Sequence, residues 1–66
     1  MKLIEEKGTT KLFEGTKGKA CISRNYGIHD KVDHYSVCVS VNGKFKQLAT
    51  RAKYEKAFAM AEAAID

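Results

Sequence analysis

The segment from residue 35 to residue 41 constrains the fold most, because large and small side chains alternate along it. Its odd positions are Tyr or Val, and its even positions are Ser or Cys. A period of two is typical of a strand with one buried face. Tyr and Val suit a pleated, packed surface, so the odd positions are the buried ones. The sequence therefore predicts a strand over residues 35–41, with the serines and the cysteine on an open outer face.

An Asn42-Gly43 turn follows this strand, and its length decides which way the next strand faces. A two-residue turn would place Phe45 on the serine and cysteine face. A three-residue loop, with its glycine in the left-handed region, pairs Phe45 with Val39 instead. We expect the three-residue loop, because it keeps Phe45 beside the valines. In that register Lys44 and Lys46 lie on the outer face.

An apolar stripe at three- and four-residue spacing predicts a C-terminal helix directly after the third strand. The stripe consists of Tyr54, Ala57, Phe58, Ala61, Ala64 and Ile65. Alanine recurs throughout this segment, which raises its helix propensity and lets the helix lie close to a sheet. Thr50 is the expected N-cap residue. A helix this short is marginal alone, so we expect its stripe to be buried.

The N-terminal half supplies the remaining strands. Residues 19–24 predict a strand with Ala20 and Ile22 toward the helix and Cys21 and Ser23 outward. Residues 2–6 and 11–14 are each long enough for a short strand. Turns are expected at 8–10 and 15–18, and a loop at 25–33. The expected fold is α+β, an antiparallel sheet of three strands, or four, packed on one C-terminal helix. It forms a single domain over residues 1–66.

Charge and hydropathy narrow the choice of partners. The 66 residues carry a net charge of +4, which favours nucleic acid or an acidic protein surface. No apolar run approaches the ~20 residues of a membrane span, so we expect no membrane contact. No signal peptide is visible, so a cytoplasmic location is expected. Small independent proteins are common among phages and mobile elements, which favours such a source. The oligomeric state is not specified.

The basic residues around the outer face indicate nucleic-acid binding. Five of them are expected near this face and its turns: Lys17, Lys19, Arg24, Lys44 and Lys46. Lysines at the rim reach phosphates, while small polar side chains such as Ser23 reach base edges. The expected function is an accessory or regulatory protein that contacts duplex DNA with the open face of its sheet. The alternative is a protein-binding modulator, such as an inhibitor of a host enzyme, that uses a sheet edge or the 25–33 loop. The plain structural alternative is a set of lysines that protects an exposed sheet.

Other site chemistry is not expected. Cys21 and Cys38 share the outer face, and in the cytosol two reduced thiols are more usual than a disulfide. His29 and His34 would complete a two-Cys, two-His zinc set. The spacing matches no familiar zinc finger, so no metal site and no cofactor are expected. The acidic and histidine side chains near residue 30 come with no oxyanion hole, so we expect no enzyme.

The segment 46–64 (KQLATRAKYEKAFAMAEAA) resembles the end of the ethylene-response-factor type of DNA-binding domain. Leu48-Ala49-Thr50 stands where that family ends its third strand, and an alanine-rich helix follows in both. The arm-binding domains of transposon and phage integrases are similar in architecture, with three antiparallel strands backed by one C-terminal helix. In both groups the open face of the sheet enters the major groove. The resemblance covers less than a third of the chain. It implies that role for Lys19, Ser23, Arg24, Lys44 and Lys46.

Overall fold

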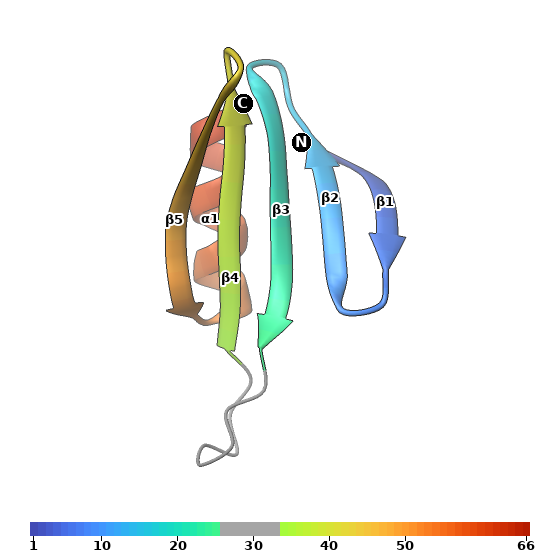
Figure 1. Cartoon of the computed structure of the whole chain (residues 1–66), viewed down its shortest axis with the longest axis vertical. Coiled ribbons are helices and arrows are strands. Elements are labelled where there is room, and N and C mark those ends of the chain that lie inside the picture. The colour runs from blue at the N-terminus through green and yellow to red at the C-terminus, as the bar shows by residue number, and fades with distance from the viewer. Residues whose placement is uncertain (26–33) are drawn as a thin grey trace.

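Five strands and one helix follow one another in the computed structural model, which describes residues 1–25 and 34–66. The elements are β1 (Lys2–Lys7), β2 (Thr10–Glu14), β3 (Gly18–Asn25), β4 (His34–Val41), β5 (Lys44–Ala52) and α1 (Tyr54–Ile65). The strands form one antiparallel sheet in the order β1-β2-β3-β4-β5 (Figure 1). The expected α+β class is confirmed. The sheet has five strands rather than three or four, because both short N-terminal segments pair in it.

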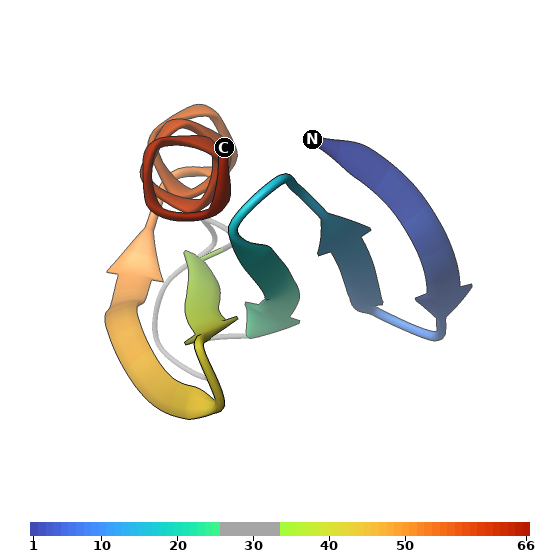
Figure 2. The same cartoon turned by 90° about the horizontal axis from the view of Figure 1, so that it is seen from above.

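The helix covers only one part of the sheet. It packs on β3, β4 and β5, while the β1–β2 hairpin lies beside it (Figure 2). The buried core lies mainly in the covered part, with one residue from β2, and its members are Phe13, Ala20, Ile22, Val37, Val39, Ala52, Ala57, Ala61 and Ile65. We call the sheet face under α1 the helix face and the opposite one the outer face.

The expected sides of β3, β4 and α1 are confirmed. Ala20 and Ile22 on β3 are buried opposite Val39 and Val37 on β4, and all four lie under the helix. Of the predicted stripe the helix buries Ala57, Ala61 and Ile65, and it closes the core with aromatic contacts. One of these joins Phe58 to the ring of Phe13 on β2, with ring centroids 5.7 Å apart in an edge-on arrangement.

The turn between β4 and β5 has two residues, so the expected three-residue loop is wrong. Asn42 has φ of 54° and Gly43 has φ of 75°, and Val41 pairs directly with Lys44. Both central residues adopt the left-handed region, as in the hairpin turn whose twist matches that of the strands. Phe45 therefore lies opposite Ser40 on the outer face and is 75% exposed. Turn geometry outweighs the burial of one aromatic ring here.

The helix begins later than expected. Thr50 lies inside β5, which continues to the buried Ala52 opposite Tyr35. The N-cap residue of α1 is Lys53, and no side-chain hydrogen bond caps the helix. A cap contributes about 1 kcal/mol, so strand pairing and the burial of Ala52 outweigh it. A loop is also expected over residues 25–33. Asn25 ends β3, and residues 26–33 lie outside the described residues.

The hairpin of β1 and β2 is joined to the end of the helix by a small set of contacts. The N–H of Lys17 donates to the carbonyl oxygen of Ile65 at 2.6 Å. The amino group of Met1 lies 2.5 Å from Asp66 Oδ2, and this hydrogen bond raises the pKa of that amino group. Gly15 lies so close to Ile65 that a Cβ there would come within 2.4 Å of the carbonyl oxygen.

Candidate functional site

The outer face is built from three rows of side chains that run across the strands. Residues that pair between neighbouring strands define these rows. The first row is Lys2, Glu14, Lys19, Ser40 and Phe45; the second is Glu5, Leu12, Cys21, Cys38 and Gln47; the third is Lys7, Thr10, Ser23 and Ser36. The middle of the face, on β3 and β4, therefore carries mainly small Ser and Cys side chains.

Charge on the outer face is nearly balanced. Its rows contain three lysines and two glutamates: Lys2, Lys7, Lys19, Glu5 and Glu14. Its hydroxyl groups are partly engaged within the protein. The Thr10 and Ser23 oxygens are 3.0 Å apart, and Asn25 Nδ2 donates to the Ser36 hydroxyl. The outer face is therefore polar without being strongly basic.

The six residues predicted to bind nucleic acid do not share one surface. Lys19 and Ser23 lie on the outer face. Lys17 lies in the turn before β3, beside the C-terminal end of α1. The other three are on the helix face, because their partners on β4 belong to the row that faces the core: Arg24, Lys44 and Lys46.

The expectation that Lys44 and Lys46 lie on the outer face is wrong, and the two-residue turn is the reason. Lys44 pairs with Val41 and Lys46 with Val39, so both lysines share the side of the valines. They border a groove between β5 and the C-terminal part of α1. Its apolar lining is Val39, Val41, Leu48 and Ala64. Lysine stems cover apolar surface of this kind while the ammonium group stays in water.

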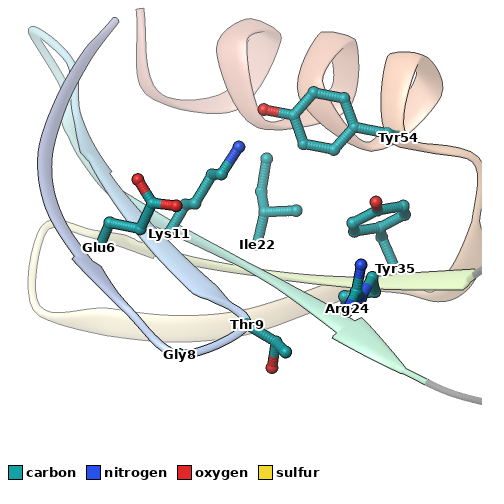
Figure 3. Close-up of a pocket in the computed structure, with 8 residues that line it drawn as sticks. All are labelled: Glu6, Gly8, Thr9, Lys11, Ile22, Arg24, Tyr35 and Tyr54. Carbon is teal, nitrogen blue, oxygen red and sulfur yellow. The ribbon is translucent and has the colours of Figure 1, made fainter.

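Arg24 lies in a separate cleft at the N-terminal end of α1 (Figure 3). The rings of Tyr35 and Tyr54 meet there with centroids 5.1 Å apart, and Lys11 Nζ lies 5.1 Å from the Tyr54 centroid. Glu6 approaches from β1, opposite Lys11. The cleft measures about 250 Å³, less than the ~300 Å³ of a small ligand pocket. We assign it a packing role, since the cation–π contact ties the hairpin to α1 and the paired rings tie β4 to α1.

The positive charge of the chain is concentrated along β5 and the start of α1. Residues 44–56 contain five basic residues and one acidic residue, a balance of +4 that equals the net charge of the whole chain. The remaining residues carry seven of each sign. We call the basic set the basic strip; its members are Lys44, Lys46, Arg51, Lys53 and Lys56, all of them exposed.

Phe45 is an exposed aromatic residue next to the basic strip. It lies between Lys44 and Lys46 in sequence and is 75% exposed on the outer face. In the first outer row it follows Ser40, with Lys19 one strand further. An aromatic ring that is open to solvent among cations is a feature of surfaces on which bases stack.

Cys21 and Cys38 are direct partners on β3 and β4, and both are free, half-buried thiols. His34 is four residues from Cys38 on the same strand, about 13 Å away at the usual strand rise. It therefore does not join the two thiols in a zinc site, and His29 lies outside the described residues. Within residues 1–25 and 34–66, no group of three or more His, Cys, Asp or Glu side chains is placed to hold a metal ion.

Sequence reasoning missed the basic strip and the exposure of Phe45. One signal in the sequence indicates both. Asn-Gly between two alternating segments is the pair that favours a two-residue turn, and that turn sends Phe45 outward. The clustering of charge in residues 44–56 is also visible without any structure.

Comparison of the chain with protein-family models, with curated proteins and with solved structures found no match. The candidate site therefore rests on the geometry of this chain alone. In the part of the chain that the structure describes, α1 has neither the length nor the hydropathy of a helix that crosses a membrane.

Proposed function

We propose that the chain binds nucleic acid along the basic strip, with a preference for single strands. One observation carries the proposal: residues 44–56, which contain the strip, have a charge equal to the whole net positive charge and include the exposed ring of Phe45. Contacts with backbone phosphates supply most of the affinity in non-specific binding, and a clustered set of Lys and Arg is their usual footprint.

The shape of the basic strip supports contact with an extended backbone. β5 is an edge strand of nine residues, which at about 3.3 Å per residue spans about 30 Å. A segment of several nucleotides can therefore lie along β5 and meet the lysines in succession.

Phe45 supports a preference for unpaired bases. Stacking of one base on an aromatic side chain contributes about 1–3 kcal/mol and requires a base that is not already stacked in a duplex. The ring is on the outer side of β5, and Lys44 and Lys46 are on the other side. One strand that runs along this edge can place a base on the ring and its phosphates toward the lysines.

Duplex DNA on the open outer face is the competing mode. Lys19 and Ser23 lie on that face, and the resemblance to three-stranded DNA-binding domains implies the same mode. The balanced charge of the outer rows makes it the weaker proposal. The two modes differ in a measurable way: Lys19→Glu should weaken binding most in the duplex mode, and Lys46→Glu should do so in the proposed mode.

A salt titration with a matched pair of variants tests the proposal. The probe is a labelled single-stranded oligonucleotide, and binding is followed by fluorescence anisotropy. Lys44→Glu with Lys46→Glu should weaken binding at least about tenfold and lower the slope of log K against log salt by about 1.4, or 0.7 per lost phosphate contact. Lys2→Glu with Lys7→Glu makes the same change of charge on the exposed β1. This control pair should weaken binding and lower the salt slope much less. Equal effects of the two pairs would mean that only net charge matters.

A second pair of variants tests the stacking contact. Phe45→Ala should weaken single-strand binding about 10- to 100-fold while leaving the salt slope unchanged, because a ring contributes no ion release. Leu3→Ala removes another exposed apolar side chain, 44% exposed on β1, and serves as the control. A Phe45→Ala variant that binds like the parent chain would remove the single-strand preference.

The groove beside the basic strip favours a second candidate, an acidic amphipathic segment of a partner protein. Its apolar lining and its two bordering lysines, Lys44 and Lys46, complement an apolar stripe flanked by carboxylates. Leu48→Ala separates the two functions, because the side chain lines the groove and is half-buried. Retained oligonucleotide binding in this variant supports the nucleic-acid proposal. Loss of binding to an acidic peptide, with no oligonucleotide binding in the parent chain, would support the protein partner.

A further inference from the structure

The middle of the outer face holds two thiols in a fixed relation. Cys21 on β3 and Cys38 on β4 are register partners, and the two strands pair without a shift from Gly18 to Asn25. Both side chains are half-buried, and no disulfide joins them. They lie on the side of the sheet opposite to the buried Ala20, Ile22, Val37 and Val39, which face α1. We call Cys21 and Cys38 the thiol pair.

The backbone hydrogen bonds decide how far apart the thiol pair stands. Successive residues of an antiparallel strand point their N–H and C=O groups to opposite neighbours. The N–H of Arg24 donates to the Thr9 carbonyl oxygen at 3.1 Å, on the β2 side. Cys21 is three residues earlier, so its backbone groups point to β4 and to Cys38. The two cysteines therefore form a hydrogen-bonded pair, with Cα atoms about 5.5 Å apart.

A Cα separation of about 5.5 Å lies within the range of disulfides, but the Cβ separation of such a pair does not favour the bond. Cβ atoms of directly opposed residues are about 4.5–5.5 Å apart, and hydrogen-bonded pairs are at the wide end of that range. A disulfide holds its Cβ atoms at about 3.8 Å. Closing the bond would pull β3 and β4 together by more than 1 Å at the centre of the sheet, where the backbone bonds of the pair resist it.

The same spacing fits two sulfur atoms on either side of one metal ion. Side chains stand roughly perpendicular to a sheet, so opposed sulfur atoms stay about as far apart as their Cβ atoms. Metal–thiolate bonds are about 2.3 Å long, by analogy with zinc, so a linear sulfur–metal–sulfur unit spans about 4.6 Å. Small rotations about χ1 bring the thiol pair to that distance without moving the backbone.

The neighbours of the thiol pair select which ion fits. The flanking residues in the same row are Leu12 and Gln47, and Glu5 is two strands from Cys21, about 9.6 Å away. Ser23 contributes a hydroxyl 3.9 Å from the Cys21 sulfur, a weak ligand for a soft ion. Zinc requires four ligands, which the described residues do not supply here. Two thiolates without hard oxygen ligands favour a soft monovalent ion.

We propose that Cys21 and Cys38 together bind one soft d10 ion, of the Cu(I) and Ag(I) class, in two-coordinate geometry. Both sulfur–hydrogen bonds break, two sulfur–metal bonds form, and two protons leave for each ion bound. No electron is transferred. The product carries one negative charge, beside Lys19 of the same face. This site goes beyond the proposed function, since none of its residues belongs to the basic strip.

Titration with Ag(I) tests the site, with released protons counted by pH-stat and stoichiometry read by native mass spectrometry. The parent chain should bind one ion tightly and release two protons. Either Cys21→Ser or Cys38→Ser should weaken that binding about 10²- to 10⁴-fold, because the second sulfur no longer acts at high effective concentration. Met1, Met60 and His34 remain in every variant and provide the background of weaker sites. One ion at each thiol, or one ion shared between two chains, would overturn the proposal.

Two further variants separate the opposed geometry from the mere number of thiols. Cys38→Ser with Gln47→Cys keeps two thiols but sets them two strands apart, so it should bind like a single-serine variant. Ser23→Cys with Ser36→Cys, added to Cys21→Ser and Cys38→Ser, moves the opposed pair one row along the same strands and should restore tight binding. Equal affinity in the first of these variants would show that geometry has no role.

Thermal unfolding supplies a readout that is independent of stoichiometry. An ion that binds only the folded chain across β3 and β4 stabilises it by mass action, so saturating Ag(I) should raise Tm by at least about 5 °C. The rise should be lost in Cys21→Ser, whose own unfolding transition without Ag(I) shows that it folds. A Tm that does not move in the parent chain, or falls, would contradict binding to the folded sheet.

Discussion

The part of the sheet under α1 and the β1–β2 hairpin are stabilised in different ways. Eight of the nine buried core residues belong to β3, β4, β5 and α1, and the hairpin contributes only Phe13. Every residue of β1 is exposed. The covered part thus has a core between two layers, whereas the hairpin extends the sheet past the edge of the helix (Figure 2).

This difference indicates where the stability of the chain lies. The hairpin depends on its pairing with β3 and on contacts that reach α1: the Phe13–Phe58 ring pair, the Lys17 backbone bond and the Met1–Asp66 ion pair. A two-stranded hairpin is marginal without such support. The covered part is small but closely packed, because alanines on α1 let the helix approach the sheet.

The largest expected effect is the loss of a side chain from the covered core. Ile22→Ala empties a site that is 1% exposed and should cost about 2–5 kcal/mol. A chain of 66 residues has about 3–10 kcal/mol of stability in total, so the substitution should remove a large part of that stability. Urea unfolding followed by circular dichroism measures the loss. Leu3→Ala on β1 is the control and should change stability by about 0.5 kcal/mol or less. Equal losses would mean that the two regions are packed alike.

A smaller global effect is expected when the hairpin loses its buried ring. Phe13→Ala removes a side chain that is 5% exposed and its edge contact with Phe58. A Phe→Ala change in a closed core costs about 3–5 kcal/mol, but here the hairpin can open while β3, β4, β5 and α1 stay folded, which limits the loss. Hydrogen exchange should become faster in β1 and β2 and change little in β4. Uniform acceleration across all five strands would instead indicate one cooperative unit.

The sequence was sufficient for the elements and for most of their sides. Alternation over residues 35–41, the Ala20 and Ile22 positions and the helical stripe each depend on one local period, and the structure agrees with all three. Burial within a strand follows from that period once one face is covered. The two short N-terminal strands also form, although a period cannot be read from four or five residues.

The register of β5 was not predictable from periodicity, because two local preferences conflict there. Burial of Phe45 favours one turn length, and the left-handed geometry of Asn42 and Gly43 favours another. The two preferences are similar in size, about 1–2 kcal/mol for left-handed geometry and about 1.5–3 kcal/mol for the burial of one ring, so the outcome depends on a small difference. Of the six predicted site residues, this register displaces Lys44 and Lys46 from the outer face. The direct pairing of Cys21 with Cys38 also depends on register. The sequence alone predicts only that the two cysteines lie on the same face of the sheet.

Gly15→Ala tests the junction between the two regions, with an expected cost of about 1–3 kcal/mol. A Cβ at this position would lie 2.4 Å from the Ile65 carbonyl oxygen and 2.5 Å from Asp66 Oδ1, so the junction must open. Gly8→Ala is the matched control in the β1–β2 turn. A Cβ at this position meets no atom within 4 Å. The expected cost of about 1 kcal/mol comes from the positive φ of +60° alone. Hydrogen exchange at the end of α1 should increase in Gly15→Ala and not in Gly8→Ala. The reverse pattern would place the junction elsewhere.

The smallest expected effect is the pH dependence of the Met1–Asp66 contact. The hydrogen bond with Asp66, and then the charges of Asp66 and Glu62, raise the pKa of the Met1 amino group above its ordinary value of 8.0. The folded chain thus holds this proton more tightly than the unfolded chain. The resulting stabilisation is fully present below pH 8 and disappears as the pH rises through the raised pKa. Asp66→Asn removes the charge and keeps the backbone N–H that caps α1 on Glu62. Its urea midpoint should lie slightly below that of the parent chain at neutral pH, and the two midpoints should converge at alkaline pH. A difference between the two midpoints that persists at alkaline pH would mean that Asp66 stabilises the chain by packing and not through the charge of the amino group.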